Sequence, residues 1–374
     1  MEPSRILFIA EGQLGDLLVV TPAIRAIKRT YPRSSVSVLI FQRRPYFRES
    51  SHQPKEYLKA SSGNGASSVF LQNPNTDTVL EVDSASLQGS KGWFRIKAES
   101  EIIANLRRRK FDTVIVAPRD RFVLWAFASG AAIRVGQMRQ VYHQLLTHTP
   151  DVQKSNAGVV RYYCALVESI GAKIDSYETE FVVPRTDQER ASKFLHTRGI
   201  SESRTLIGIH PGAYGRDRIW PPERFAQLID LLQAANGSRV LLCGGTYDNS
   251  VIKRICELVK TKPVVADTGN DISFLGALFK RCVLFVGNNS GPRHLAAAVG
   301  TRTLALLGRN DQIEWDVYED KKRHRILQGE ENCPTCPQGV CYNRIPDGEQ
   351  CGSHCMRMIS VETVASKARM MLHE

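Results

Sequence analysis

Long apolar runs are missing from this chain of 374 residues. No stretch approaches the roughly 18 to 20 apolar residues that a membrane-spanning helix needs, which excludes an integral helical membrane protein. The N-terminus enters a strand pattern directly, without the pattern of a secretory signal, so we expect a cytoplasmic protein. Zinc-finger, RNA-recognition and helix-turn-helix signatures are also missing, and we expect no nucleic-acid partner.

The composition and charge are those of a soluble globular protein with anionic partners. Apolar residues make up 42% of the chain and charged residues 24%, and the length favours two domains. The net charge of +12 favours phosphorylated substrates, anionic membrane surfaces or nucleic acid. The one dense basic run, residues 107–110, lies between a predicted helix and a strand, where a solvated helix end is the simpler interpretation.

The nine cysteines divide into two groups. Four of them lie in periodic apolar segments and are expected to be inert core residues. The other five crowd into one segment rich in proline and glycine, at Cys333, Cys336, Cys341, Cys351 and Cys355. In a cytosolic protein this clustering favours a metal-binding or redox-sensitive loop over a disulfide framework.

Strand and helix patterns alternate along the chain in two sets. The first set has predicted strands at residues 5–10, 36–41, 78–82, 113–117 and 134–136, and the second at 206–210, 239–243, 263–265, 282–286 and 303–307. Amphipathic segments between them predict helices, while the polar residues from about 48 to 76 read as a surface insertion. This alternation predicts an α/β protein with two doubly wound, Rossmann-like domains, 1–185 and 186–355, facing a central cleft.

Ligands of such sheets bind beyond the carboxyl ends of the strands, and unusual residues gather there. The segments concerned are residues 12–16, 210–218, 244–248 and 288–294. In the last segment, Asn289 and Ser290 suit a helix N-cap, Gly291 permits close backbone approach, and Pro292 suits the first helical turn. A helix N-terminus of this kind is an anion site.

Four segments, in order, resemble the bacterial heptosyltransferase family, glycosyltransferase family 9. The first is Gly15-Asp16-Leu17-Leu18 followed by residues 21–28, and the others are Ile209-His210-Pro211-Gly212-Ala213, residues 218–225 and residues 289–297. Apart from the insertion, the resemblance covers nearly the whole chain. It implies a GT-B fold, an acceptor-binding first domain, a nucleotide-sugar-binding second domain, and a C-terminal helix within 356–374 that packs back on the first domain.

The resemblance also implies inverting, metal-independent transfer from a nucleotide-diphosphate sugar such as ADP-heptose, with no cofactor required for catalysis. The implied acceptor is a lipopolysaccharide core or a related phosphorylated glycolipid at the cytoplasmic membrane face. The positive net charge fits peripheral contact with an anionic bilayer. Two alternatives remain: a heptosyltransferase that modifies protein, and an inactive nucleotide-binding scaffold in envelope assembly.

The family's catalytic base falls on Asp16. Inverting transfer needs a group that takes the proton of the acceptor hydroxyl, and a carboxylate suits that task. An aspartate directly after a strand also makes a good helix N-cap. The resemblance favours the base.

Arg218 occupies the place of the family's diphosphate-contacting lysine. A guanidinium binds phosphate in a bidentate manner and keeps its charge. Arg216 is a nearby competitor, and a solvated loop arginine is the alternative. With Ser290, Gly291 and Pro292, Arg218 makes up the predicted diphosphate site.

Weaker donor-site candidates are Gly15, Gly212, Gly244, Gly245, Asn289 and His294. The Gly244–Gly245 pair permits close approach to a nucleotide or closes a tight turn. Asn289 stands where the family usually has aspartate, which leaves the donor sugar open. His294 either contacts the donor or packs within the protein, and His210 and Asp248 fit structural and helix-capping roles better than chemistry.

The cysteine segment begins with the C-x2-C spacing of zinc and iron sites at Cys333 and Cys336. The later spacings to Cys341, Cys351 and Cys355 are irregular, and free thiols or disulfides are equally compatible. Any metal held there would be structural, because the proposed chemistry needs none.

Overall fold

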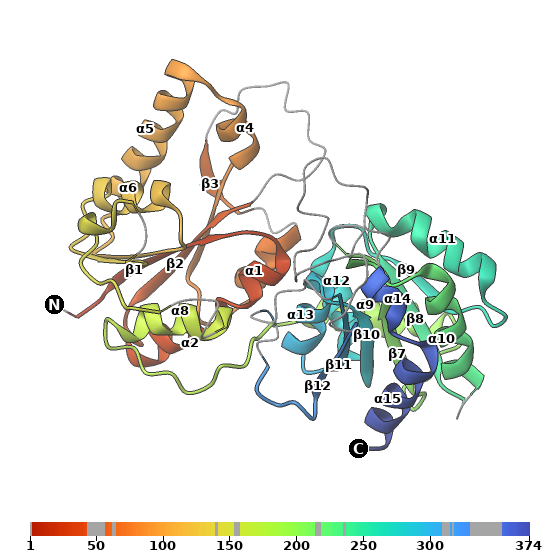
Figure 1. Ribbon diagram of the computed structural model, residues 1–374. Helices are drawn as coiled ribbons and strands as arrows, with labels where there is room; N and C mark the ends of the chain where they lie inside the picture. The colour runs from red at the N-terminus through yellow and green to blue at the C-terminus, as the bar shows by residue number, and fades with distance from the viewer. Residues whose placement is uncertain are drawn as a thin grey trace. The chain divides into compact units, whose positions relative to one another are not determined.

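The computed structural model describes residues 2–42, 57–61, 65–138, 141–152, 158–213, 218–234, 237–308, 315, 318–329 and 354–374 (Figure 1). The chain forms two compact units, one spanning Met1–Val182 and the other containing Val183–Ile313 and Tyr318–Glu374. Each unit has its own sheet, helices and core. Within the described residues, no helix is long and apolar enough to cross a membrane.

The first unit holds a six-stranded sheet in the order β3-β4-β2-β1-β5-β6. Its strands are β1 (Arg5–Glu11), β2 (Ser35–Phe41), β3 (Leu58–Ala60), β4 (Thr78–Val82), β5 (Thr113–Val116) and β6 (Ile133–Val135). Its helices are α1 (Leu14–Leu18), α2 (Thr21–Thr30), α3 (Ser68–Leu71), α4 (Ser84–Gly89), α5 (Gly92–Arg108), α6 (Asp120–Ala128) and α8 (Val159–Glu168). All neighbouring strands are parallel except β3 and β4.

Helices cover both faces of this sheet, which explains why β1 is apolar along its length. Leu7 and Ile9 point to the face where residues of α5 and α6 complete the core. Phe8, between them, contacts Tyr163 of α8 on the opposite face. Helices α2 and α8 pack side by side there (Figure 1).

The expected polar insertion at 48–76 is only partly a surface segment. Residues 43–56 and 62–64 lie outside the described residues, whereas Leu58–Ala60 adds the edge strand β3 to the sheet. Val69 and Phe70 of α3 are buried in the first unit. The many serines, glycines and asparagines around these short elements hid their weak periodicity.

The second unit holds another six-stranded sheet, all parallel, in the order β12-β11-β10-β7-β8-β9. Its strands are β7 (Leu206–His210), β8 (Arg239–Gly244), β9 (Val264–Asp267), β10 (Leu284–Asn288), β11 (Arg302–Leu307) and β12 (His324–Gln328). Its helices are α9 (Arg185–His196), α10 (Pro222–Ala234), α11 (Asn249–Leu258), α12 (Ile272–Lys280), α13 (Gly291–Ala298), α14 (His354–Met358) and α15 (Val361–His373). Among these, β12 had not been predicted.

Trp220 and Phe225 anchor one face of the second sheet. Both side chains are buried, their rings meet edge to face with centroids 4.9 Å apart, and the indole Nε1 of Trp220 donates to the carbonyl oxygen of Ile359 at 3.0 Å. The short connection between α14 and α15 is thereby held against the loop before α10.

The final helix α15 packs on the second unit, and its expected contact with the first domain stays a prediction. Val364, Ala368 and Met371 belong to the same hydrophobic core as the strands of the second sheet. Arg302 and Arg369 add hydrogen bonds between α15 and this unit. The physical reason is the apolar stripe of α15, which packs beside α10 (Figure 1).

Candidate active site

The loop after β1 holds Asp16 by its backbone. One carboxylate oxygen of Asp16, Oδ2, accepts the Gln13 N–H at 2.8 Å. Gly12 has φ +133, and a Cβ on it would lie 2.2 Å from Cγ of Asp16, so only glycine leaves room for this carboxylate. The contact is a helix-capping one. It also fixes the orientation of a carboxylate that is half-buried at the carboxyl end of β1.

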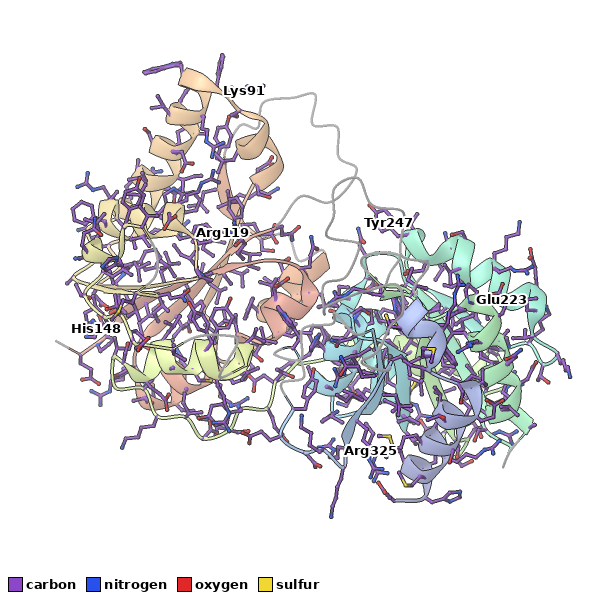
Figure 2. The ribbon with its side chains drawn as sticks, in the orientation of Figure 1. Lys91, Arg119, His148, Glu223, Tyr247 and Arg325 are labelled. Carbon is purple, nitrogen blue, oxygen red and sulfur yellow. The ribbon has the colours of Figure 1, made fainter. Side chains whose placement is uncertain are left out.

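Beside this loop the structure places an ion pair that the sequence had not singled out. Nε of Arg119, which follows β5, lies 2.6 Å from Oε2 of the nearly buried Glu11 at the end of β1. The hydrogen bond from Arg119 to Glu11 raises the pKa of Arg119, so the guanidinium stays charged. Figure 2 labels Arg119 within the first unit. The signal available in the sequence was a charged residue at each of two strand ends.

In the second unit, Asn288 joins the end of β10 to the loop after β7. Its Oδ1 accepts the Trp220 N–H at 3.1 Å, and its Nδ2 donates to the carbonyl oxygens of Pro211 at 2.7 Å and Gly212 at 3.3 Å. The side chain is fully buried. Sequence reasoning missed this residue, although a polar residue closing an apolar strand was a usable signal.

His210 and Asp248 form a second connection, between the loops after β7 and β8. Nε2 of His210 lies 3.3 Å from Oδ2 of Asp248, which also accepts the Gly245 N–H at 2.9 Å. Asp248 directly precedes α11, but its carboxylate turns to these two groups and makes no side-chain cap of that helix. Burial disfavours the ionised carboxyl, but the hydrogen bond and charge of His210 outweigh it, so the pKa of Asp248 is lowered.

The predicted glycines stand where backbone must approach these side chains closely. A Cβ on Gly212 would lie 1.8 Å from Oδ1 of Asp248, and one on Gly244 would lie 2.8 Å from Cβ of Asp248. Gly212 therefore lies against the His210–Asp248 pair, and the Oγ of Ser290 is 3.5 Å from the Gly212 carbonyl oxygen. The structure thus brings together the strand ends of β7, β8 and β10. Gly15, by contrast, lies in α1 of the first unit.

Helix α13 begins as the sequence predicts. Ser290 is the extended N-cap residue, with no side-chain cap hydrogen bond, and Pro292 stands in the first turn. Asn289 turns inward instead, where its Oδ1 accepts a hydrogen bond from Nη1 of the buried Arg293 at 2.9 Å. The groups that this terminus has available for an anion are therefore its backbone N–H groups and not the Asn289 amide.

His294 packs inside the second unit. Its Nδ1 lies 2.7 Å from the hydroxyl of Tyr318, and the Tyr318 ring stacks at 4.5 Å from His324. Of the two roles left open by the sequence, these contacts favour packing.

Some of the remaining predicted residues belong to the part of the chain that the structure describes, and others lie outside it. Arg218 directly follows residues 214–217, which lie outside the described residues and include its competitor Arg216. Cys333, Cys336, Cys341 and Cys351 also lie outside them. Cys355 is buried within the apolar core of the second unit. In the described ranges, no group of three or more His, Cys, Asp or Glu side chains could hold a metal ion.

Comparison with known proteins places these features in a family. The model of glycosyltransferase family 9 (heptosyltransferase) matches residues 100–343. Lipopolysaccharide heptosyltransferase 3 of Escherichia coli K12 is 24% identical over 314 residues, which are 82% of this chain and 83% of that protein.

Solved structures agree in fold over the full length. A family 9 glycosyl transferase from Veillonella parvula superposes with a TM-score of 0.77 at 22% identity, covering 100% of this chain and 99% of that one. The E. coli heptosyltransferase WaaC with ADP-2-deoxy-2-fluoro heptose has a TM-score of 0.68 at 15% identity, covering 98% and 99%. The predicted α/β fold of GT-B type is confirmed.

Proposed function

Because the chain belongs to glycosyltransferase family 9 and is a glycosyltransferase, we propose that it moves a heptose from ADP-heptose to a lipopolysaccharide core or a related phosphorylated glycolipid. The observation that carries the proposal is the convergence of Gly212, Gly245, Asp248 and Ser290 at the strand ends of the second unit. Named relatives support the sugar and the acceptor, since one is a lipopolysaccharide heptosyltransferase and another was solved with an ADP-heptose analogue.

The second unit is the proposed donor-binding domain. Gly212 and Gly244 make room for the Asp248 carboxylate between the strand ends. Helix α13 begins beside them, since the Oγ of its N-cap residue Ser290 lies 3.5 Å from the Gly212 carbonyl oxygen. Partial positive charge at a helix N-terminus suits the diphosphate of a sugar nucleotide. Arg218 adds a permanent cation for the same group.

The first unit is the proposed acceptor-binding domain, with Asp16 as general base. As the acceptor hydroxyl oxygen bonds to the anomeric carbon, Asp16 takes the hydroxyl proton and the bond from that carbon to the diphosphate oxygen breaks. Attack opposite the leaving group inverts the anomeric configuration. ADP departs with the electron pair, and Arg218 and the α13 N-terminus stabilise its negative charge without a metal ion.

Replacing Asp16 tests this mechanism. Asp16→Asn keeps the shape of the side chain but removes the base, and we expect heptose transfer to fall by at least about 10²-fold, the lower end of the usual contribution of a general base. ADP affinity, measured by calorimetry, should change little. Asp151→Asn, which alters an exposed carboxylate of the same unit, is the matched control and should transfer at the wild-type rate. Wild-type turnover in Asp16→Asn would overturn the assignment.

The donor is tested by calorimetry with free nucleoside diphosphates. ADP should bind more tightly than UDP or GDP, and Arg218→Ala should weaken ADP binding by about tenfold or more, the value of one charge-assisted phosphate contact. Arg185→Ala, at an exposed arginine of α9, should bind ADP like the wild type. Equal affinity for all three nucleotides would remove the ADP-heptose assignment and leave a glycosyltransferase of another donor.

The cysteine segment supports a separate and purely structural proposal. The C-x2-C spacing of Cys333 and Cys336 fits zinc or iron. Cys355, in contrast, lies among apolar side chains, where it fits a core residue better than a ligand. Metal analysis of the full chain, purified anaerobically, should find about one zinc or iron per chain. A metal-free protein with unchanged activity and stability would overturn this proposal.

A further inference from the structure

Three large apolar side chains stand exposed at the start of α5, in the first unit. Trp93 is 73% exposed, Phe94 54% and Ile96 58%. Further along the same helix, Ala98, Ile102 and Leu106 are buried against the sheet. The apolar residues of α5 therefore fall into two groups. The later ones pack in the hydrophobic core of this unit, and those of the first turn are not among its core residues. We call residues 91–97 the α5 tip.

The helical spacing explains the division. Ala98, Ile102 and Leu106 follow at intervals of four and form one stripe. Trp93, Ile96 and Lys97 stand at i, i+3 and i+4, which places them together on the opposite side of the helix. Phe94 stands four residues before Ala98, at the N-terminal end of the buried stripe, and is 54% exposed there. Beyond them this outer side is polar and of mixed charge, with exposed Ser100, Glu101, Arg107 and Arg108.

Positive charge surrounds the exposed apolar residues. Lys91 and Lys97 are exposed, and the sequence has no acidic residue from Ser84 to Ala98. Arg95 faces Glu99, with Nε and Oε1 4.0 Å apart, and Glu99 is also paired with Arg121. The two lysines are therefore the cations that the α5 tip presents outward. Figure 2 labels Lys91 at the N-terminal end of α5, at an extremity of the first unit.

We propose that the α5 tip is a membrane-contacting surface that inserts Trp93, Phe94 and Ile96 into the interface of an anionic bilayer. Tryptophan and phenylalanine beside lysine are the pattern of interfacial anchors: the rings enter the headgroup region while the ammonium groups reach anionic phosphates. The choice of an anionic bilayer rests on the proposed glycolipid acceptor. The lysines supply the charge complementarity that this surface requires.

The size of the patch also favours a bilayer over a second protein. Large apolar side chains bury about 150–250 Å² each, so the three partly exposed ones offer about 400 Å². A stable protein interface needs about 800 Å² from each partner. An interfacial anchor needs less, because apolar insertion and attraction of lysines to lipid act together.

Vesicle flotation of the full chain tests the proposal. The probes are vesicles of phosphatidylethanolamine with phosphatidylglycerol and vesicles of phosphatidylcholine alone. We expect binding to the first that falls in high salt, and weak binding to the second. Combining Trp93→Ser, Phe94→Ser and Ile96→Ser should reduce binding at least about tenfold, and so should Lys91→Glu with Lys97→Glu.

Matched controls alter exposed residues of the second unit. Val283→Ser, at a side chain 47% exposed, and the pair Lys193→Glu with Lys260→Glu should bind vesicles within about twofold of the wild type. The proposal is overturned if the wild type does not bind anionic vesicles, if the triple variant binds as well as the wild type, or if sedimentation velocity shows that the triple substitution breaks a dimer and vesicle binding does not change.

The same samples separate this inference from the proposed function. ADP affinity is measured on every variant, and transfer is measured with a lipid-free, soluble fragment of the acceptor. Failure at the α5 tip leaves ADP binding and transfer to the soluble fragment intact. Failure of the proposed function abolishes transfer in the wild type while vesicle binding persists.

Discussion

The imidazole Nε2 of His210 and the carboxylate Oδ2 of Asp248 lie 3.3 Å apart, between loops that follow two adjacent parallel strands. Because Oδ2 also accepts the Gly245 N–H, Asp248 holds the backbone after β7 and the backbone after β8 at once. The glycines at 212 and 244 are required by the approach of this carboxylate.

Replacing Asp248 should loosen both loops. Asp248→Ala leaves the Gly245 N–H and the His210 ring without their partner, and we expect a loss of about 1–3 kcal/mol in the free energy of unfolding. ADP affinity should fall as well, because the two loops belong to the proposed donor site. Urea denaturation and calorimetry measure the two effects. Glu202→Ala, at an exposed glutamate in the same unit, is the control, and equal stability of the two variants would contradict the expectation.

The same carboxylate predicts a pH dependence. The pKa of Asp248 is lowered in the folded protein, because hydrogen bonding to His210 and to the Gly245 N–H outweighs the opposing effect of burial. A carboxyl with a lowered pKa stabilises the fold above its unfolded value of about 4, and this contribution disappears as the pH falls through the folded pKa. The difference in unfolding free energy between wild type and Asp248→Asn should therefore shrink below about pH 4. A difference that stays constant from neutral to acid pH would exclude Asp248 as its source.

Asn288 should matter more for stability than its neighbour Ser290. Asn288→Ala removes three hydrogen bonds and leaves the Trp220 N–H buried without an acceptor, at an expected cost of about 1–3 kcal/mol. Ser290→Ala removes only contacts of 3.4–3.5 Å and should stay within about 0.5 kcal/mol of the wild type. Thermal and urea unfolding measure both. If Ser290→Ala lost more unfolding free energy than Asn288→Ala, Ser290 and not Asn288 would be the residue that holds the end of β10.

Gly12 should be irreplaceable for activity. Gly12→Ala places a Cβ 2.2 Å from Cγ of Asp16 and also strains a backbone at φ +133, so the carboxylate of the proposed base must move and transfer should fall by about tenfold or more. Gly130→Ala is the matched control, since Gly130 also has positive φ, +84, but open space around it. The control should lose some stability and keep its turnover. Equal turnover in the two variants would show that the position of Asp16 is not critical.

Two adjacent methionines test the packing of α15 on the second unit. Met371 is 1% exposed and Met370 40% exposed. Met371→Ala should cost about 2–5 kcal/mol, the range for buried methionine. Met370→Ala should change the unfolding free energy by no more than about 0.5 kcal/mol. Urea denaturation that finds equal costs would contradict the observed face of the helix.

The strand and helix pattern was legible in the sequence because burial follows local periodicity. A parallel strand covered on both faces is apolar throughout, as in β1 and β10, and its ends are marked by glycine and polar residues. Short elements with mixed composition were missed, among them β3 and α3, because their few apolar residues carry no clear period.

The sequence did not show which elements pack against one another. The amphipathic pattern of α15 predicts that one face of the helix is buried. It does not indicate which unit buries that face, and only the packed structure places α15 beside α10. The same holds for Asn288, whose partners lie almost 80 residues earlier, at Pro211 and Gly212.

What the sequence by itself determined is the family, the alternation of strands and helices, and the residue types at the strand ends, since each is written in contiguous or evenly spaced residues. The tertiary structure decided that Asn289 turns inward to Arg293, that His294 packs against Tyr318, that Asp248 joins two loops, and that the first turn of α5 remains exposed. These outcomes depend on contacts between residues far apart in the chain, whose geometry arises only when the sheets and helices pack.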